Sequence, residues 1–99
     1  MHDPDEVIRS ELVQETARIS WQELQRFFAN GSAIAVDDDL DLIDVAIAVR
    51  KDNSKAIKAW MSQGRLGQVS DQQAMHWHEN NTNLWAVVIK PWVLVQDKE

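Results

Sequence analysis

The sequence predicts a small α+β protein in which about five helices pack on a short sheet of two to three strands. The chain has 99 residues, enough for one domain with one hydrophobic core. Apolar residues recur at helical spacing in several segments, whereas 33–36 and 84–95 are apolar runs typical of strands. We therefore expect a single domain over 1–99, frayed at 1–4 and 97–99, with helices mostly on one face of the sheet.

The N-terminal third of the chain is predicted to contain two helices. Asp3 can cap the first helix and Pro4 suits its first turn, and we expect this helix to run to about Arg18. A capping box that begins at Ser20 starts the second helix, which Gly31 ends.

Two helices are also predicted in the middle of the chain, after the strand at 33–36. Polar residues at helical intervals favour a third helix over 40–51. Ser54 is expected to cap a fourth helix that ends at Gly64. Three apolar residues of this helix are expected to face the core: Ile57, Trp60 and Met61.

The C-terminal third combines strands with one more helix. Residues 66–69 suit a short strand, and a capping box at Ser70 starts a fifth helix that ends near Asn80. The apolar run 84–95 predicts one long strand that bends at Pro91, because proline has no N–H for a strand ladder.

Composition excludes several classes of function. The chain has no cysteine, so a thiolate zinc site and a cysteine nucleophile are excluded. Its acidic N-terminus does not suit a secretory signal, and its apolar runs are too short to span a membrane, so we expect a cytoplasmic protein without membrane contact. The net charge of −6 repels phosphate backbones and makes nucleic acid an unfavourable partner. We expect no cofactor.

An ordered set of residues runs through positions 11 to 96. It consists of Glu11-Leu12, Glu15-Thr16-Ala17, Trp21-Gln22-Glu23-Leu24, Phe27-Phe28-Ala29, Val36-Asp37, Leu40-Asp41-Leu42, Trp60, Asp71 with Ala74 and Trp77, Trp85-Ala86-Val87-Val88 and Pro91-Trp92-Val93-Leu94-Val95. This set resembles the small bacterial family called domain of unknown function 2288. The resemblance implies no assigned activity, cofactor or catalytic residue.

An acidic cluster follows the first predicted strand. Its members are Asp37, Asp38, Asp39, Asp41 and Asp44. Asp37, Asp39 and Asp41 are candidate ligands for a divalent cation, but the pattern of a calcium loop fails because Leu42 stands where glycine is required. We expect instead that one aspartate caps the third helix and that the others favour its positive end.

Two histidines are the other candidate metal ligands. His76 and His78 lie two residues apart on the fifth helix, so their side chains point away from each other, whereas helical ligand pairs lie three or four apart. We therefore expect a structural role for both.

Five tryptophans invite an aromatic binding site, but three lie on apolar helix faces and two in the apolar strand, so we expect core packing for them. The strand 84–95 is apolar on both faces, so either helices wrap both sides or a second copy covers one. Because the bend at Pro91 can carry Trp92 and Leu94 off the sheet, we expect these two at an interface, and a homodimer near this strand.

The basic residues gather between 50 and 65. Lys51, Lys55 and Lys58 form a candidate anion-facing surface, but the following helix lacks the cations of a DNA-reading helix. We expect a solvated lysine face.

The sequence has no catalytic signal, because it contains neither a nucleophile elbow nor a phosphate loop. We therefore expect a small cytoplasmic protein-interaction or regulatory module with an unidentified protein partner. Two alternatives remain: a nucleic-acid-associated module that uses the lysine face, and a metal- or small-ligand-binding protein that uses Asp37–Asp44.

Overall fold

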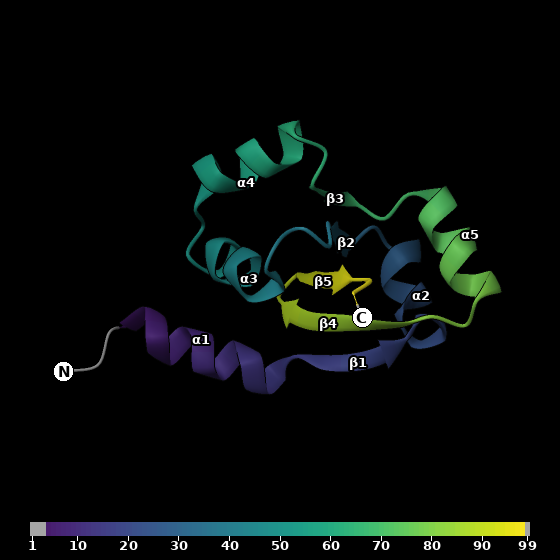
Figure 1. Ribbon diagram of the computed structural model, residues 1–99, viewed down its shortest axis with the longest axis horizontal. Coiled ribbons are helices and arrows are strands. Elements are labelled where there is room, and N and C mark those ends of the chain that lie inside the picture. The colour runs from purple at the N-terminus through teal and green to yellow at the C-terminus, as the bar shows by residue number, and fades with distance from the viewer. Residues whose placement is uncertain (1–3, 99) are drawn as a thin grey trace.

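The computed structural model describes residues 4–98, which form five helices and five strands (Figure 1). The helices are α1 (Pro4–Glu15), α2 (Trp21–Ala29), α3 (Leu42–Arg50), α4 (Ser54–Ser62) and α5 (Asp71–Glu79). The strands are β1 (Ala17–Ser20), β2 (Ala33–Val36), β3 (Leu66–Gln68), β4 (Asn83–Ile89) and β5 (Trp92–Gln96). The predicted cap Asp3 lies outside the described residues.

Local capping signals set the starts of four helices. Ser20 accepts a hydrogen bond from the N–H of Glu23, and Ser70 forms a capping box with Gln73, both as predicted. The cap of α4 is Asn53 rather than the predicted Ser54, which is the first helical residue. An asparagine side chain performs the same role by accepting from a backbone N–H, here that of residue 56.

The five strands form one mixed sheet in the order β1-β4-β5-β2-β3. Strands β2 and β5 are parallel, and the other three neighbouring pairs are antiparallel. The expected sheet of two to three strands was too small. The predicted strand at 66–69 is present as β3, which pairs with β2 at one edge.

Strand β1 replaces the end of the first predicted helix. The helix stops at Glu15, and both the N–H and the Oγ1 of Thr16 donate to the carbonyl of Leu12, at 3.0 and 2.6 Å. The chain is then extended, and Ile19 pairs with Leu84 in the register of β1 and β4. The helix predicted to reach Arg18 therefore ends three residues earlier, because pairing with a distant strand stabilises the extended form.

The C-terminal apolar run is a hairpin rather than one bent strand. Strands β4 and β5 are antiparallel neighbours, with Ile89 opposite Trp92, and the turn between them contains a cis peptide bond before Pro91. Because the chain reverses there, two of the central strands come from this single segment. It supplies a large share of the buried side chains, including Leu84, Ala86, Val87, Val93, Leu94 and Val95.

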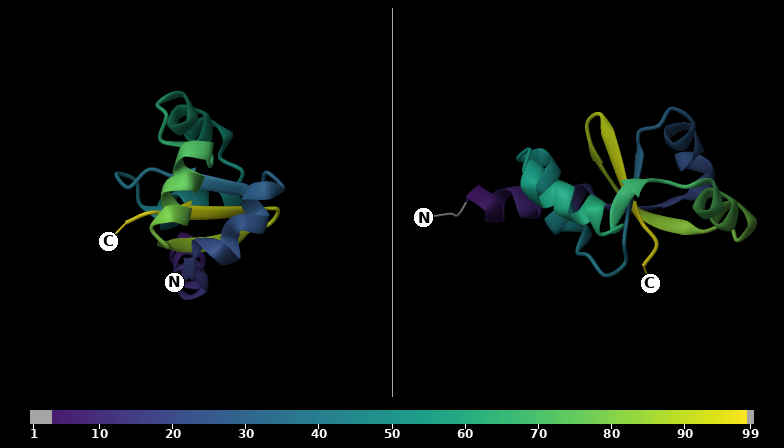
Figure 2. Two further views of the ribbon diagram at one scale, coloured as in Figure 1. Left: turned by 90° about the vertical axis from the view of Figure 1, so that its right-hand side faces the viewer. Right: turned by 90° about the horizontal axis from the view of Figure 1, so that it is seen from above.

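Helices cover both faces of the sheet, and the expectation of helices mostly on one face was wrong. Helices α2 and α5 pack on one face, where Trp21 and Trp77 contact each other with ring centroids 5.2 Å apart. Helices α1 and α3 cover the other face, where Leu12 and Val45 are fully buried. Figure 2 shows the sheet between these two layers, with α4 beside α3. The double cover explains why β4 is apolar on both sides.

Among the described helices, none is both long and apolar enough to cross a membrane.

Candidate functional site

The acidic loop between β2 and α3 is organised by its own aspartates. Asp37 Oδ1 accepts a hydrogen bond from the N–H of Asp39 at 2.9 Å. Asp41 Oδ1 accepts from the N–H groups of Ile43 and Asp44, at 2.8 and 3.3 Å, and so caps α3. The expectation that one aspartate caps this helix is confirmed.

The same loop lies at the carboxyl end of the parallel strand pair. Asp37 follows β2 and Asp97 follows β5, so the two residues leave the sheet at the same end. Gln96 holds the loop in place, because its Nε2 donates to the carbonyl oxygens of Asp37 and Leu40 at 2.8 and 2.7 Å. Gaps beyond the carboxyl ends of parallel strands are common ligand sites in α/β sheets.

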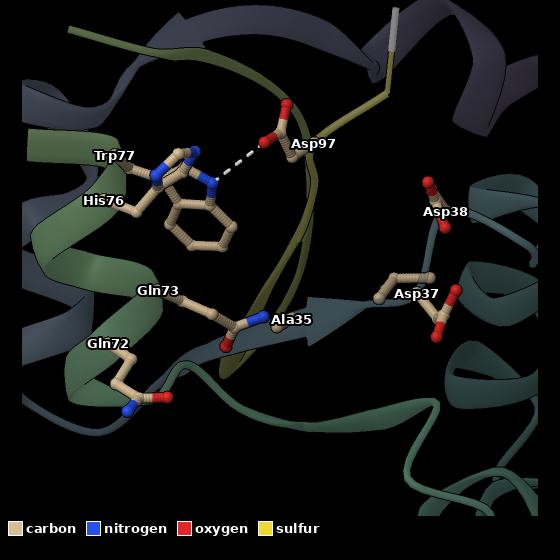
Figure 3. A pocket seen from close by; sticks show the side chains of 9 residues that line it. Ala35, Asp37, Asp38, Gln72, Gln73, His76, Trp77 and Asp97 are labelled. Atoms are coloured by element: carbon tan, nitrogen blue, oxygen red, sulfur yellow. Dashed lines mark hydrogen bonds between the residues drawn. The ribbon is translucent and has the colours of Figure 1, made fainter. Parts of the chain in front are cut away.

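A pocket of about 400 Å³ lies between this end of the sheet and α5 (Figure 3). Its lining residues are Ala35, Val36, Asp37, Asp38, Gln72, Gln73, His76, Trp77 and Asp97. On one side Trp77 Nε1 donates to Asp97 Oδ2 at 3.1 Å, and Asp37 and Asp38 lie on the opposite side (Figure 3). The pocket therefore brings together carboxylates from two loops and an imidazole from α5.

The carboxyl groups of Asp37 and Asp38 influence each other. The backbone N–H of Asp39 lowers the pKa of Asp37, and a side-chain hydrogen bond with Asp38 lowers it further. The same side-chain hydrogen bond raises the pKa of Asp38, and the negative charges of its neighbours add to the rise. The two neighbouring carboxyl groups therefore shift in opposite directions, Asp37 toward the charged form and Asp38 toward the protonated form.

The candidate metal ligands do not form one site. The carboxylates of Asp37, Asp38 and Asp39 offer oxygens within 4.8 Å of one another. The predicted ligand Asp41 is instead turned to the N–H groups of α3. His78 Nδ1 lies 3.2 Å from Gln25 Nε2, on the side of α5 that meets α2. His76 does line the pocket, which the sequence analysis did not anticipate.

An apolar groove of about 500 Å³ lies at the other end of β5, on the opposite face of the sheet. It is lined by Ile34, Val49, Ile57, Met61, Leu66, Gly67, Gln68, Trp92 and Leu94. Trp92 is 39% exposed, in agreement with its predicted exposure, whereas Leu94 is only 1% exposed because α3 and the sheet enclose it. Both residues stay in the sheet as part of β5, so the expectation that the bend carries them off the sheet was wrong; Trp92 is exposed at the groove and Leu94 forms its buried floor.

Met61 was predicted to face the core, but it is 54% exposed and lines the groove. Helix α4 has no buried residue, because it contacts α3 and β3 from the side and does not lie over the sheet. Helical periodicity identifies an apolar face correctly but does not show whether another element covers it. The sequence therefore showed that Met61 belongs to the apolar face of α4, but not that this face stays partly uncovered.

The predicted lysine face is present but divided. Lys51 caps the end of α3, and Lys55 and Lys58 lie on α4; all three are exposed. Lys51 also lines a separate shallow pocket between α3 and α4. Lys58 is the member that lies next to the apolar groove, since it follows Ile57 and precedes Met61 by three residues in the helix.

Comparisons with known proteins agree with the fold. A family model described as "Protein of unknown function (DUF2288)" matches residues 7–97. The solution NMR structure of PA1075 from Pseudomonas aeruginosa is similar, with 42% sequence identity and a TM-score of 0.81. The similarity covers 98% of this chain and 90% of the PA1075 chain. Comparison with curated proteins gives no match.

Proposed function

The chain belongs to the DUF2288 family of proteins of unknown function, and we propose from its geometry that it is a small protein-interaction module. The binding surface is the apolar groove between α4, β3 and the start of β5. Its ligand is an apolar segment of a partner protein.

One observation carries this proposal. Among the described residues six large hydrophobic side chains are exposed, and two of them, Met61 and Trp92, line the same groove. Buried or half-buried aliphatic side chains form its floor and walls, so a bound apolar side chain would contact hydrocarbon on several sides. Exposed apolar patches of this kind mark interaction sites, and tryptophan is enriched among the residues that dominate binding energy.

The acidic pocket supports binding less well, because its carboxylates already have partners within the chain. Asp37 accepts from a backbone N–H, and Asp97 accepts from Trp77. These bonds account for Asp37 as part of its loop and for Asp97 as a partner of a side chain of α5.

We therefore expect Mg²⁺, Ca²⁺ or Mn²⁺ to leave the melting temperature nearly unchanged, since only a ligand that binds the native state adds stability. Thermal denaturation with and without each ion at sub-millimolar concentration tests this expectation. A rise of several degrees that disappears in Asp37→Asn would assign a metal site to the loop instead.

The proposed groove can be tested by selecting from a displayed library of random short peptides. The wild-type protein should enrich peptides that carry apolar residues, and Met61→Glu should fail to enrich them, because a carboxylate would stand at the groove wall. Met75→Glu is the matched control, since Met75 is 62% exposed but lies on α5, against the opposite face of the sheet. Enrichment that survives in Met61→Glu, or no apolar enrichment by the wild type, would reject the groove.

A second copy of the chain is the other occupant to consider, as the predicted homodimer requires. A two-fold contact through the groove would place Lys58 of both copies beside the same interface, and among the described residues no acidic side chain lines the groove to pair with them. Light scattering at micromolar concentration measures the mass directly. A dimer that Trp92→Ala converts to monomer would assign the groove to self-association and not to a partner.

A further inference from the structure

We infer that the segment bound by the groove carries acidic residues beside its apolar ones. This inference rests on the proposed function of the groove and adds the chemistry of the partner. The chain as a whole has a net charge of −6, yet residues 45–70 carry five cations, Arg50, Lys51, Lys55, Lys58 and Arg65, and one carboxylate, Asp52. This stretch contains the end of α3, the whole of α4 and β3, which form one wall and one edge of the groove.

Two lysines, one of these five and one from the turn between β4 and β5, lie close in sequence to the groove's exposed apolar residues. Lys58 and Met61 lie three residues apart on α4 and are therefore neighbours on the helix surface. Lys90 lies in the turn between β4 and β5, two residues before Trp92. Both lysines are exposed, and none of the residues that line the groove is charged. Along the chain, exposed lysines thus lie close to both exposed apolar residues of the groove, Met61 and Trp92.

A ligand that matches this surface combines apolar side chains with carboxylates. The apolar side chains enter the hollow, which at about 500 Å³ falls within the usual range of ligand pockets, about 300–1,000 Å³. The carboxylates remain at the rim, where they pair with Lys58 and Lys90 in solvent. Rim charges of this kind contribute mainly to association rate and to discrimination between partners, and salt weakens their effect.

The walls favour a protein over a nucleic acid as the anionic partner. Single-stranded nucleic acids bind on platforms of several aromatic rings. Here the groove presents one aromatic residue, Trp92, among aliphatic side chains such as Ile57 and Met61. Aliphatic walls suit the methyl and methylene groups of a peptide.

The test compares the peptides selected by the wild type with those selected by the double variant Lys58→Glu, Lys90→Glu. The wild type should enrich apolar peptides with acidic flanks, and the double variant should enrich apolar peptides with basic flanks. The matched control is Lys55→Glu, Lys98→Glu, which changes the net charge equally. Lys55 lies on α4 further from Met61, and Lys98 follows the other end of β5, so this control should retain the acidic preference.

Affinities of one selected acidic peptide then give the size of the effect. Fluorescence anisotropy at low salt should show a loss of about tenfold in the double variant and a smaller loss in the control, because rim ion pairs are individually weak. High salt should reduce the difference between the variants.

The outcomes separate the inference from the proposed function. Apolar peptides with neutral or basic flanks from the wild type would overturn the acidic preference and leave the groove as a binding site. No apolar enrichment at all would overturn both. A labelled oligothymidine that binds the wild type at micromolar concentration and loses affinity in the same double variant would assign the lysines to nucleic acid instead.

Discussion

At the scale of single residues, Gln96 shows how one side chain can hold the candidate site. It is 3% exposed, and its amide reaches the carbonyls of Asp37 and Leu40, which lie 59 and 56 positions earlier in the sequence. In the sequence Gln96 only marks the polar end of an apolar run. The sequence could not identify it, because its partners are backbone groups brought close by the parallel pairing of β2 and β5.

We expect Gln96→Leu to reduce the free energy of unfolding by about 1–3 kcal/mol, because the carbonyl oxygens of Leu40 and Asp37 each lose the side-chain donor, although Asp37 keeps the N–H of Leu40. Urea denaturation measures the change. Gln14→Leu is the control, since Gln14 is exposed on α1. A Gln96→Leu variant as stable as the wild type would mean that water replaces both hydrogen bonds.

The shifted carboxyl groups predict a pH response of the loop. The pKa of Asp37 should lie below 3.8 and that of Asp38 above it. The lowered pKa of Asp37 stabilises the fold at pH values above the pKa that Asp37 has in the unfolded chain. This stabilisation disappears as the pH falls through the pKa of the folded protein. The raised pKa of Asp38 stabilises the protonated loop at low pH, and this contribution disappears as the pH rises. The two effects oppose each other, so the net dependence should be small.

Carboxyl carbon NMR shifts measured across the acid range test this prediction. In Asp38→Ala, the pKa of Asp37 should rise toward its ordinary value but stay below it, because the N–H of Asp39 still donates. A wild-type Asp38 that titrates at or below 3.8 would contradict the raised pKa of its carboxyl group.

At the scale of elements, the sequence predicted what depends on neighbouring residues. The caps at Ser20, Asp41 and Ser70 rest on side chains that bond to backbone groups two or three residues away. Strand β1 and the C-terminal hairpin were wrongly predicted because they depend on distant pairing. Residue 17 lies opposite residue 86, and the residues near either position do not indicate that the two strands pair in this register.

The contribution of one capping side chain to stability can be measured at the start of α3. Asp41→Ala should lower the free energy of unfolding by about 1 kcal/mol, since the N–H groups of Ile43 and Asp44 lose their acceptor. Asp39→Ala is the control, because Asp39 uses its backbone N–H and not its carboxylate in the loop. Chemical denaturation of both variants gives the comparison, and equal losses would show that charge near the helix start matters more than the cap.

At the scale of the whole molecule, the two helical layers share a single sheet. Residues 84–89 are apolar on both faces of the strand, so the sequence already indicated that other parts of the protein must cover both faces. The sequence did not show which helices supply each cover. The order β1-β4-β5-β2-β3 decides that, because it places the C-terminal hairpin in the middle of the sheet and in contact with both layers.

Buried residues of the hairpin belong to both cores. We therefore predict that a substitution that destabilises one helical layer also destabilises the other. Leu12, a fully buried residue of α1, can be replaced by alanine at an expected cost of about 2–5 kcal/mol. Trp21 and Trp77, which lie in the α2 and α5 layer, serve as fluorescent reporters when the other three tryptophans are replaced by phenylalanine. In that background, Leu12→Ala should move the unfolding midpoints seen by fluorescence and by far-UV circular dichroism together.

Val13→Ala controls for the substitution itself, because Val13 neighbours Leu12 but is 55% exposed, and it should leave both midpoints near their original values. If the fluorescence midpoint stays in place in Leu12→Ala while the dichroism midpoint falls, the α1 and α3 layer unfolds separately. In that case the groove, which this layer and α4 build, would open without loss of the opposite core. Coincident transitions would show instead that the groove persists only as long as the whole domain is folded, because its floor residues Ile34 and Leu94 come from β2 and β5, which are both interior strands of the sheet.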